Sequence, residues 1–158
     1  MLSACSVAGP PVGGPLPQPA DLHSSTEVIL TGSAALGAPA GWTPAPTLTT
    51  PVFPVAAPQL LAAMREILLA RPRTWLTVSY PEQEQAFFIV RSYMLNLPDI
   101  VVVQAVPASA TTSKAVIFSR SRYDGAPFIG ANKERVQALV KALTKRFGTV
   151  PEAPAKPK

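Results

Sequence analysis

The chain has 158 residues, 19 of them proline, and a formal net charge of +5. A single cysteine excludes an internal disulfide and a multi-cysteine metal site, and the one histidine leaves too few ligands for a zinc site. The sequence has no run of about 18 apolar residues, so we expect no membrane-spanning helix.

Composition divides the chain near Pro58. Residues 1–57 hold ten prolines and no Lys or Arg, whereas residues 58–158 hold all 14 basic residues. Proline-rich sequence favours extended linkers, because proline lacks the amide donor that helices and central strands require. We therefore expect a Pro/Gly/Ala-rich tether over 1–57, partly ordered over 25–57, an α+β domain over 58–148 and a flexible basic tail over 149–158.

The stretch Leu-Ser-Ala-Cys at residues 2–5 resembles the cleavage site of bacterial lipoprotein signals. In that pattern an aliphatic residue and two small residues precede a cysteine whose thiol accepts a diacylglyceryl group. Stable attachment needs more than one acyl chain, and a lipidated Cys5 would carry three. Ser6 resembles the pattern that sorts lipoproteins to the outer membrane. Only Met1 precedes the motif, whereas a complete signal carries an apolar stretch, and a chance match is the alternative.

Two segments predict helices. The first begins at Pro58 and ends near Ala70, ahead of Pro72. Its apolar residues recur at helical spacing: Leu60, Leu61, Met64, Ile67 and Leu68. The second has Asn132 as its N-cap and Gly148 just after its end. Its apolar stripe consists of Val136, Leu139, Val140, Leu143 and Phe147.

Four strand-like runs lie between these helices. They are residues 74–80, 85–95, 99–106 and 114–122, all rich in β-branched and aromatic side chains. Their connections are short, which favours antiparallel neighbours. We therefore expect an α+β fold, a four-stranded antiparallel meander with both helices on one face in the order α-β-β-β-β-α, preceded by the tether.

Residues 119–143 resemble the C-terminal signature of the bacterial family known as domain of unknown function 1499. That signature is a strand ending in Ser-Arg-Ser-Arg, a short loop, an aromatic residue or Leu, Gly, a small residue, Asn, and a helix with basic residues at its start. The matching residues are Ser119, Arg120, Ser121, Arg122, Phe128, Gly130, Ala131, Asn132, Lys133 and Arg135. The chain departs from the pattern at Pro127 and by the extra residue Ile129. The resemblance covers roughly residues 54–147 and implies an envelope-associated, lipoprotein-like member without a known activity.

One place in the predicted domain could bind an anion. The strand over 114–122 leads through a loop to a helix N-terminus, where free amide donors attract negative charge. We predict that this site consists of Arg120, Arg122, Asn132, Lys133 and Arg135, and that it takes a carboxylate, a phosphate or a lipid head group. The alternative is structural: the arginines pair with Asp99, Asp124 or Glu134, and Asn132 only caps the helix.

The residues give no catalytic constellation. His23 lies in the tether, so Ser119 and Ser121 have no recognisable base, and no Gly-rich phosphate loop occurs. The aromatic residues fall inside strand patterns, which argues against a nucleic-acid partner. We predict a bacterial cell-envelope lipoprotein on the periplasmic side with a non-catalytic binding or assembly domain and no metal or cofactor. Its partners would be the membrane, through the lipid anchor, and an envelope protein or anionic ligand. The alternatives are a soluble domain that binds a small ligand or anion, and an enzyme with unrecognised catalytic groups.

Overall fold

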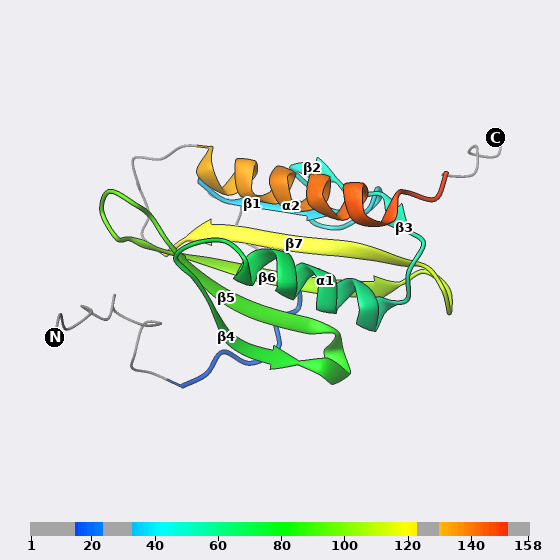
Figure 1. Cartoon of the computed structure of the whole chain (residues 1–158), viewed down its shortest axis with the longest axis horizontal. Helices are drawn as coiled ribbons and strands as arrows, with labels where there is room; N and C mark the ends of the chain where they lie inside the picture. The colour runs from blue at the N-terminus through cyan, green and yellow to red at the C-terminus, as the bar shows by residue number, and fades with distance from the viewer. Residues whose placement is uncertain (1–14, 24–32, 123–129, 152–158) are drawn as a thin grey trace, which may run out of the picture.

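The computed structural model describes residues 15–23, 33–122 and 130–151, which fold around one mixed sheet (Figure 1). The helices are α1 (Ala57–Leu69) and α2 (Ala131–Phe147), and a short 3-10 helix spans Pro81–Gln83. The strands are β1 (Ala35–Ala38), β2 (Leu48–Thr49), β3 (Val52–Phe53), β4 (Thr74–Tyr80), β5 (Gln85–Arg91), β6 (Pro98–Pro107) and β7 (Ser113–Ser121). Among the described residues no helix is long and apolar enough to cross a bilayer.

The sheet corrects the predicted four-stranded meander. Its strand order is β2-β1-β7-β6-β5-β4, and β3 pairs with a further part of β7. Strands β4 to β7 pair antiparallel in chain order, but three strands that precede α1 extend the sheet and β1 pairs with β2 in parallel. The α+β class is confirmed, and the order α-β-β-β-β-α holds from α1 to α2, whereas the strand number and the purely antiparallel pairing were wrong because three strands precede α1.

The missed strands are short and lie beside prolines. β1 reads Ala-Leu-Gly-Ala, and β2 and β3 have two residues each. Ala and Gly have low strand propensity, and two residues are too short a run to indicate a strand, so pairing with β7 and β1 determines the conformation of these segments. Phe53 of β3 is nonetheless completely buried, so the segment expected to be a tether contributes to the core. The sequence Ser-Thr-Glu-Val-Ile-Leu-Thr-Gly over residues 25–32 also has the composition of a short strand, and it lies outside the described residues.

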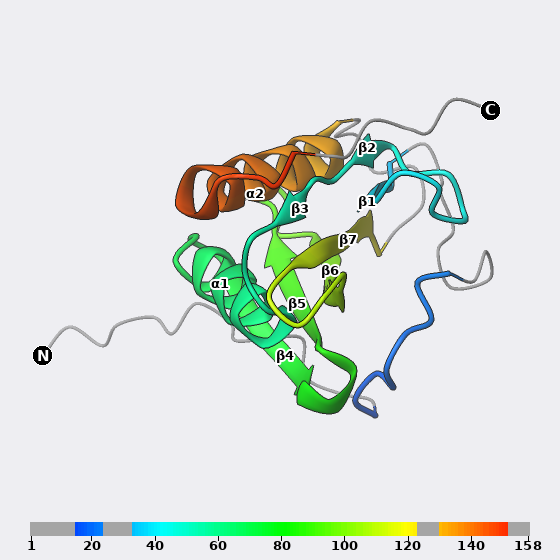
Figure 2. The ribbon, with the colours of Figure 1, turned by 90° about the vertical axis from the view of Figure 1, so that its right-hand side faces the viewer.

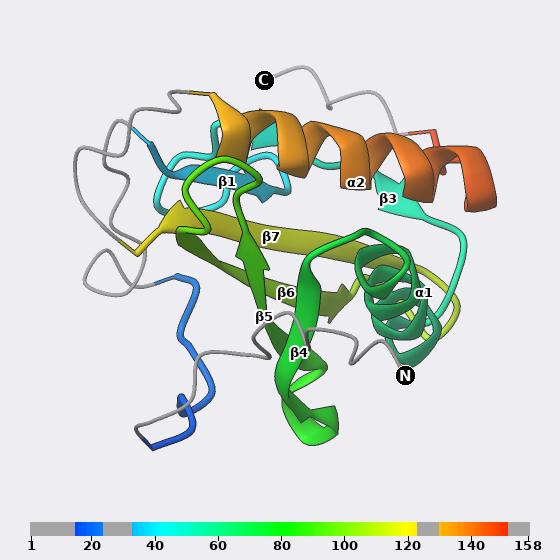
Figure 3. The ribbon, with the colours of Figure 1, turned by 60° about the vertical axis from the view of Figure 1, so that its left-hand side comes forward.

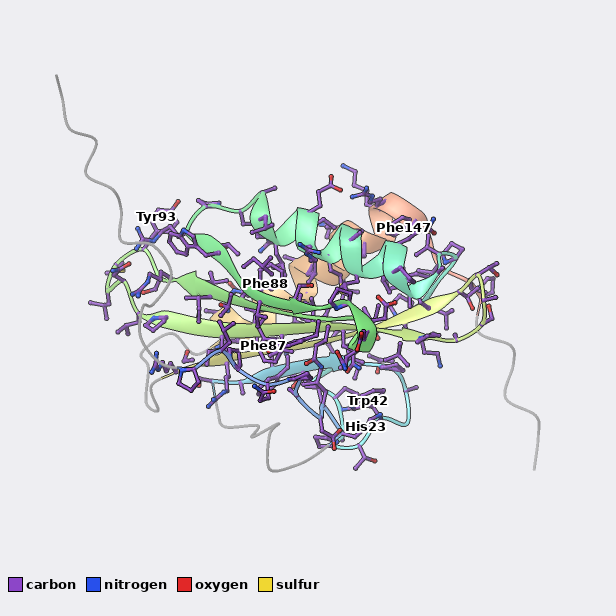
Figure 4. The ribbon with its side chains drawn as sticks, turned by 90° about the horizontal axis from the view of Figure 1, so that it is seen from below. His23, Trp42, Phe87, Phe88, Tyr93 and Phe147 are labelled. Atoms are coloured by element: carbon purple, nitrogen blue, oxygen red, sulfur yellow. The ribbon has the colours of Figure 1, made fainter. Side chains whose placement is uncertain are left out.

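Both helices pack on one face of the sheet, and the chain before β1 covers part of the other (Figure 2). Alternation along the central strands divides the core: Phe88 and Ile117 face the helices, while Phe87 and Phe118 face the opposite side. Figure 4 shows Phe88 and Phe87 on these two sides. On the second side Leu22 is buried.

The start of α2 differs from the prediction. Gly130 is the N-cap with a φ of 104°, and Asn132 is the second residue of the helix. A positive φ suits glycine because it has no Cβ to clash with the backbone. The Asn132 side chain makes no cap hydrogen bond and is buried instead, so its predicted role as the cap was wrong.

Candidate functional site

The structure does not bring the five residues of the predicted anion site together. Ser119 lies on the helix side of β7, so the alternation of the strand places Arg120 on the opposite face. Arg122 is exposed just after β7, and Lys133 is exposed on α2. Only Asn132 and Arg135 share a site. Cys5, the predicted lipidation residue, and Asp124 lie outside the described residues.

Asn132 and Arg135 belong to a buried polar network between α2 and β7. The Asn132 Oδ1 atom accepts hydrogen bonds from Ser119 Oγ at 2.7 Å and from Arg135 Nη1 at 2.6 Å. Its Nδ2 atom donates to the backbone oxygen of Ser33 at 2.6 Å. Because Asn132 satisfies three groups at once, it joins α2 to β7 and to the chain just before β1.

Arg135 also forms an ion pair with Asp99 of β6. The Arg135 Nη2 atom lies 2.8 Å from Asp99 Oδ2, and the two side chains keep only 13% and 11% of their exposure. Ser121 Oγ donates to the other carboxylate oxygen, Asp99 Oδ1, at 2.9 Å. Asp99 therefore compensates the charge of Arg135 inside the protein. For this arginine, the structure agrees with the alternative in which the arginines pair with acidic residues of the domain and do not bind an anion.

This ion pair lies in the wall of a cavity of about 670 Å³. The cavity is bounded by the end of α1, the first half of α2, the sheet, and the β5–β6 connection over residues 92–97. Figure 3 shows this connection beside the start of α2. The apolar side chains that line it include Leu68, Val90, Met94, Leu97, Ala131 and Ala138.

Some charged groups of the cavity wall have an ion-pair or hydrogen-bond partner in the domain, and others have none among the described residues. Three arginines and two acids line it: Arg71, Arg91, Arg135, Asp99 and Glu134. Arg91 Nη1 donates to the backbone oxygen of Asn96 at 2.7 Å, and its buried Nε atom has no partner. Within the described part of the chain, the Arg71 guanidinium also has no partner. An anionic group on a ligand would therefore be attracted most directly to Arg71.

The one histidine lies elsewhere. The His23 ring stacks on Trp42 with a centroid separation of 3.5 Å, and Trp42 packs on the face of the sheet opposite the helices. Figure 4 shows this pair below the sheet. Ser119 and Ser121 face the helix side, so His23 cannot act as their base. No group of three His, Cys, Asp or Glu side chains among the described residues could hold a metal ion.

The sequence alone does not indicate the cavity. Residues 93–95 were assigned to a strand over 85–95, but β5 ends at Arg91 and these residues belong to the connection that borders the cavity. Their apolar character was the signal for a strand. The Asn-Leu-Pro sequence that follows was the turn signal, and the loop begins earlier than that signal suggested.

No protein-family model and no curated protein sequence matches this chain. Among solved structures, the chain is similar to the one described as "Crystal structure of the di-domain ARO/CYC BexL from the BE-7585A biosynthetic pathway". The two are 12% identical, and the match covers 61% of this chain and 44% of that chain with a TM-score of 0.48. The chain thus spans less than half the length of that protein, and a likeness this distant does not indicate a shared function.

Proposed function

We propose that the domain is a non-catalytic binding module that holds a mainly apolar small molecule in the cavity between α1, α2 and residues 92–97. The size and lining of the cavity carry this proposal. Ligand sites typically have volumes of about 300–1,000 Å³ and apolar walls with a few polar groups. This cavity has about 670 Å³ and a largely apolar wall, and its charged groups are Arg71, Arg91, Glu134 and the Asp99–Arg135 pair.

The arginines favour a ligand with an acidic group. Asp99 compensates Arg135, so that arginine is not the first choice for a ligand anion. Arg71 is half-buried at the cavity wall and has no partner among the described residues. A ligand with an apolar body and a carboxylate would bury the body against Leu68 and Ala138 and place the carboxylate near Arg71.

For the cellular setting we propose a lipid-anchored protein of the bacterial cell envelope, related to the domain of unknown function 1499 family. The support is the Leu-Ser-Ala-Cys pattern ending at Cys5 and the Ser-Arg-Ser-Arg run over residues 119–122. The mass of the N-terminal peptide of protein made in its own host tests the anchor. A triacylated peptide that begins at Cys5 is the expected result, and an unmodified Cys5 would contradict it.

Titration with cis-parinaric acid, a fluorescent fatty acid, tests the cavity. The expected result is saturable binding that Ala138→Phe weakens at least about tenfold, because the ring fills space that the ligand needs. Arg71→Gln should weaken binding about three- to tenfold through loss of the charge opposite the carboxylate. Ala62→Phe is the matched control, since Ala62 is exposed on α1 and does not line the cavity.

Two results would contradict the cavity proposal. One is the absence of saturable binding to the parent protein. The other is equal affinity in Ala138→Phe and Ala62→Phe, which would place the fatty acid on the surface. Circular dichroism of each variant confirms that the fold is retained, and Ala138→Leu serves as a smaller obstruction if the phenylalanine unfolds the domain.

A further inference from the structure

The connection over residues 92–97 exposes three consecutive apolar side chains. Tyr93, Met94 and Leu95 are 76%, 79% and 54% exposed. Connections between strands usually carry Gly, Asn, Asp, Ser or Pro at their tips, and a run of exposed apolar residues generally has a functional reason. None of these three side chains takes part in the buried polar network around Asn132 and Arg135.

Hydrogen bonds hold the backbone of this loop in place. Ser92 N donates to Leu97 O at 3.0 Å, and Leu97 N donates to Ser92 Oγ at 3.0 Å. Arg91 and Arg73 both donate to Asn96, the first to its backbone oxygen and the second to its side-chain oxygen. The backbone of the loop is therefore held at both ends, while the side chains of Tyr93, Met94 and Leu95 remain largely exposed.

Positive charge lies next to these apolar side chains. Arginines at this end of the domain include Arg71, Arg73 and Arg91. The Arg73 guanidinium lies 5.6 Å from the centre of the Tyr93 ring, and Figure 4 places Tyr93 at one end of the molecule. The acids nearby in the cavity wall are Glu134 and Asp99, and Arg135 already compensates Asp99.

We propose that the loop over residues 92–97 docks on an anionic lipid surface. A membrane interface is the environment that suits this combination, since it takes tyrosine at the head-group level, apolar side chains below it and arginine beside lipid phosphates. Met94 and Leu95 enter the interface, Tyr93 lies at its boundary, and Arg73 beside the Tyr93 ring contacts the head groups. This surface is separate from the anchor proposed at Cys5.

Docking of the loop also affects the cavity. This consequence rests on the proposed function, in which the cavity holds an apolar ligand. Tyr93 and Met94 also line the cavity, so a docked loop places the cavity wall against the bilayer. An apolar molecule could then pass between the membrane and the cavity with little exposure to water. The docking itself needs no ligand and is tested without one.

The experiment is co-sedimentation with vesicles of about three parts phosphatidylcholine to one part phosphatidylglycerol. The full chain is used with Cys5→Ser, so that no acyl chain contributes to binding. Met94→Ser combined with Leu95→Ser should lower the partition coefficient at least about tenfold. Leu16→Ser is the matched control, because Leu16 is 58% exposed and lies outside the loop. Raising the salt to about 0.5 M should also weaken binding, because it screens the arginines.

The docking proposal is overturned if the parent protein does not bind these vesicles, or if the double serine variant binds as well as the parent. It is also overturned if sedimentation velocity shows that the loop instead joins two copies of the chain, with a dimer that the double serine variant abolishes. Met94→Ser alone provides the same comparison if the double variant is poorly folded. Ala138→Phe should bind the vesicles as the parent does, because it changes the cavity and not the loop. The vesicle assay therefore tests docking, whereas the titration with cis-parinaric acid tests the cavity, and one proposal can fail while the other holds.

Discussion

Replacing Asp99 with Asn should lower the free energy of unfolding by about 2–3 kcal/mol. The substitution keeps the shape of the side chain but removes the charge that lies 2.8 Å from Arg135. Breaking a fully buried ion pair costs about 3–5 kcal/mol, because it leaves an uncompensated charge. We expect a lower value here, since both side chains line the cavity and Arg135 can still donate to Ser119 and Asn132.

Urea unfolding followed by circular dichroism measures this change. Glu66→Gln is the control, because it breaks the 2.9 Å pair with Arg146, in which the side chains are 68% and 44% exposed. The control should lose no more than about 0.5 kcal/mol, as exposed pairs usually do. Equal losses in Asp99→Asn and Glu66→Gln would refute the reasoning, since they would mean that water screens the Asp99–Arg135 pair as it screens a surface pair.

Three further substitutions test the packing and the polar network, each by the same unfolding measurement. Gly37→Ala should lower the free energy of unfolding by about 1–3 kcal/mol, because the new Cβ would lie 2.6 Å from Val136 Cγ1. Adding Val136→Ala should recover part of this loss, and a double variant that recovers none would contradict the predicted clash. Leu22→Ala should cost about 2–4 kcal/mol because Leu22 is only 2% exposed; Leu16→Ala should change stability little, and equal effects would mean that residues 15–23 do not pack on the sheet. Asn132→Ala should cost about 2–3 kcal/mol, whereas a loss of about 1 kcal/mol would equal that of a simple helix cap.

The sequence predicted the strands of the antiparallel run with small errors at their ends. β4, β6 and β7 each combine β-branched or aromatic residues with flanking turn signals, so local sequence alone indicates them. β1 lacks such a signal, because three of its four residues are alanine or glycine. Its place beside β7 depends on the close approach of α2, which requires Gly37 at the contact with Val136. That approach is a long-range property, and no local pattern contains it.

The candidate site illustrates the same limit. Period two along β7 predicts which side chains share a face, but it does not say which face α2 covers. Once α2 packs on the Ser119 side, Arg135 joins the buried network and Arg120 is left on the opposite face. The cavity depends in addition on where β5 ends, because the apolar residues after Arg91 continue the strand pattern although the chain has already left the sheet.

The position of the first described segment limits how far the domain could stand from a membrane. Gln85 Nε2 donates to the backbone oxygen of Ala20 at 2.9 Å and its Oε1 accepts from Ala20 N at 2.7 Å, and Leu22 is buried beside them. Together with the hydrogen bond from the Tyr80 hydroxyl to the Pro17 backbone oxygen, these contacts hold the chain on the sheet from Pro17 onward, so eleven residues, 6–16, separate the first such contact from Cys5. Eleven residues extend at most about 40 Å. If Cys5 is acylated as proposed, the domain is therefore held close to the bilayer, and the 92–97 loop has to reach the same surface within that short range.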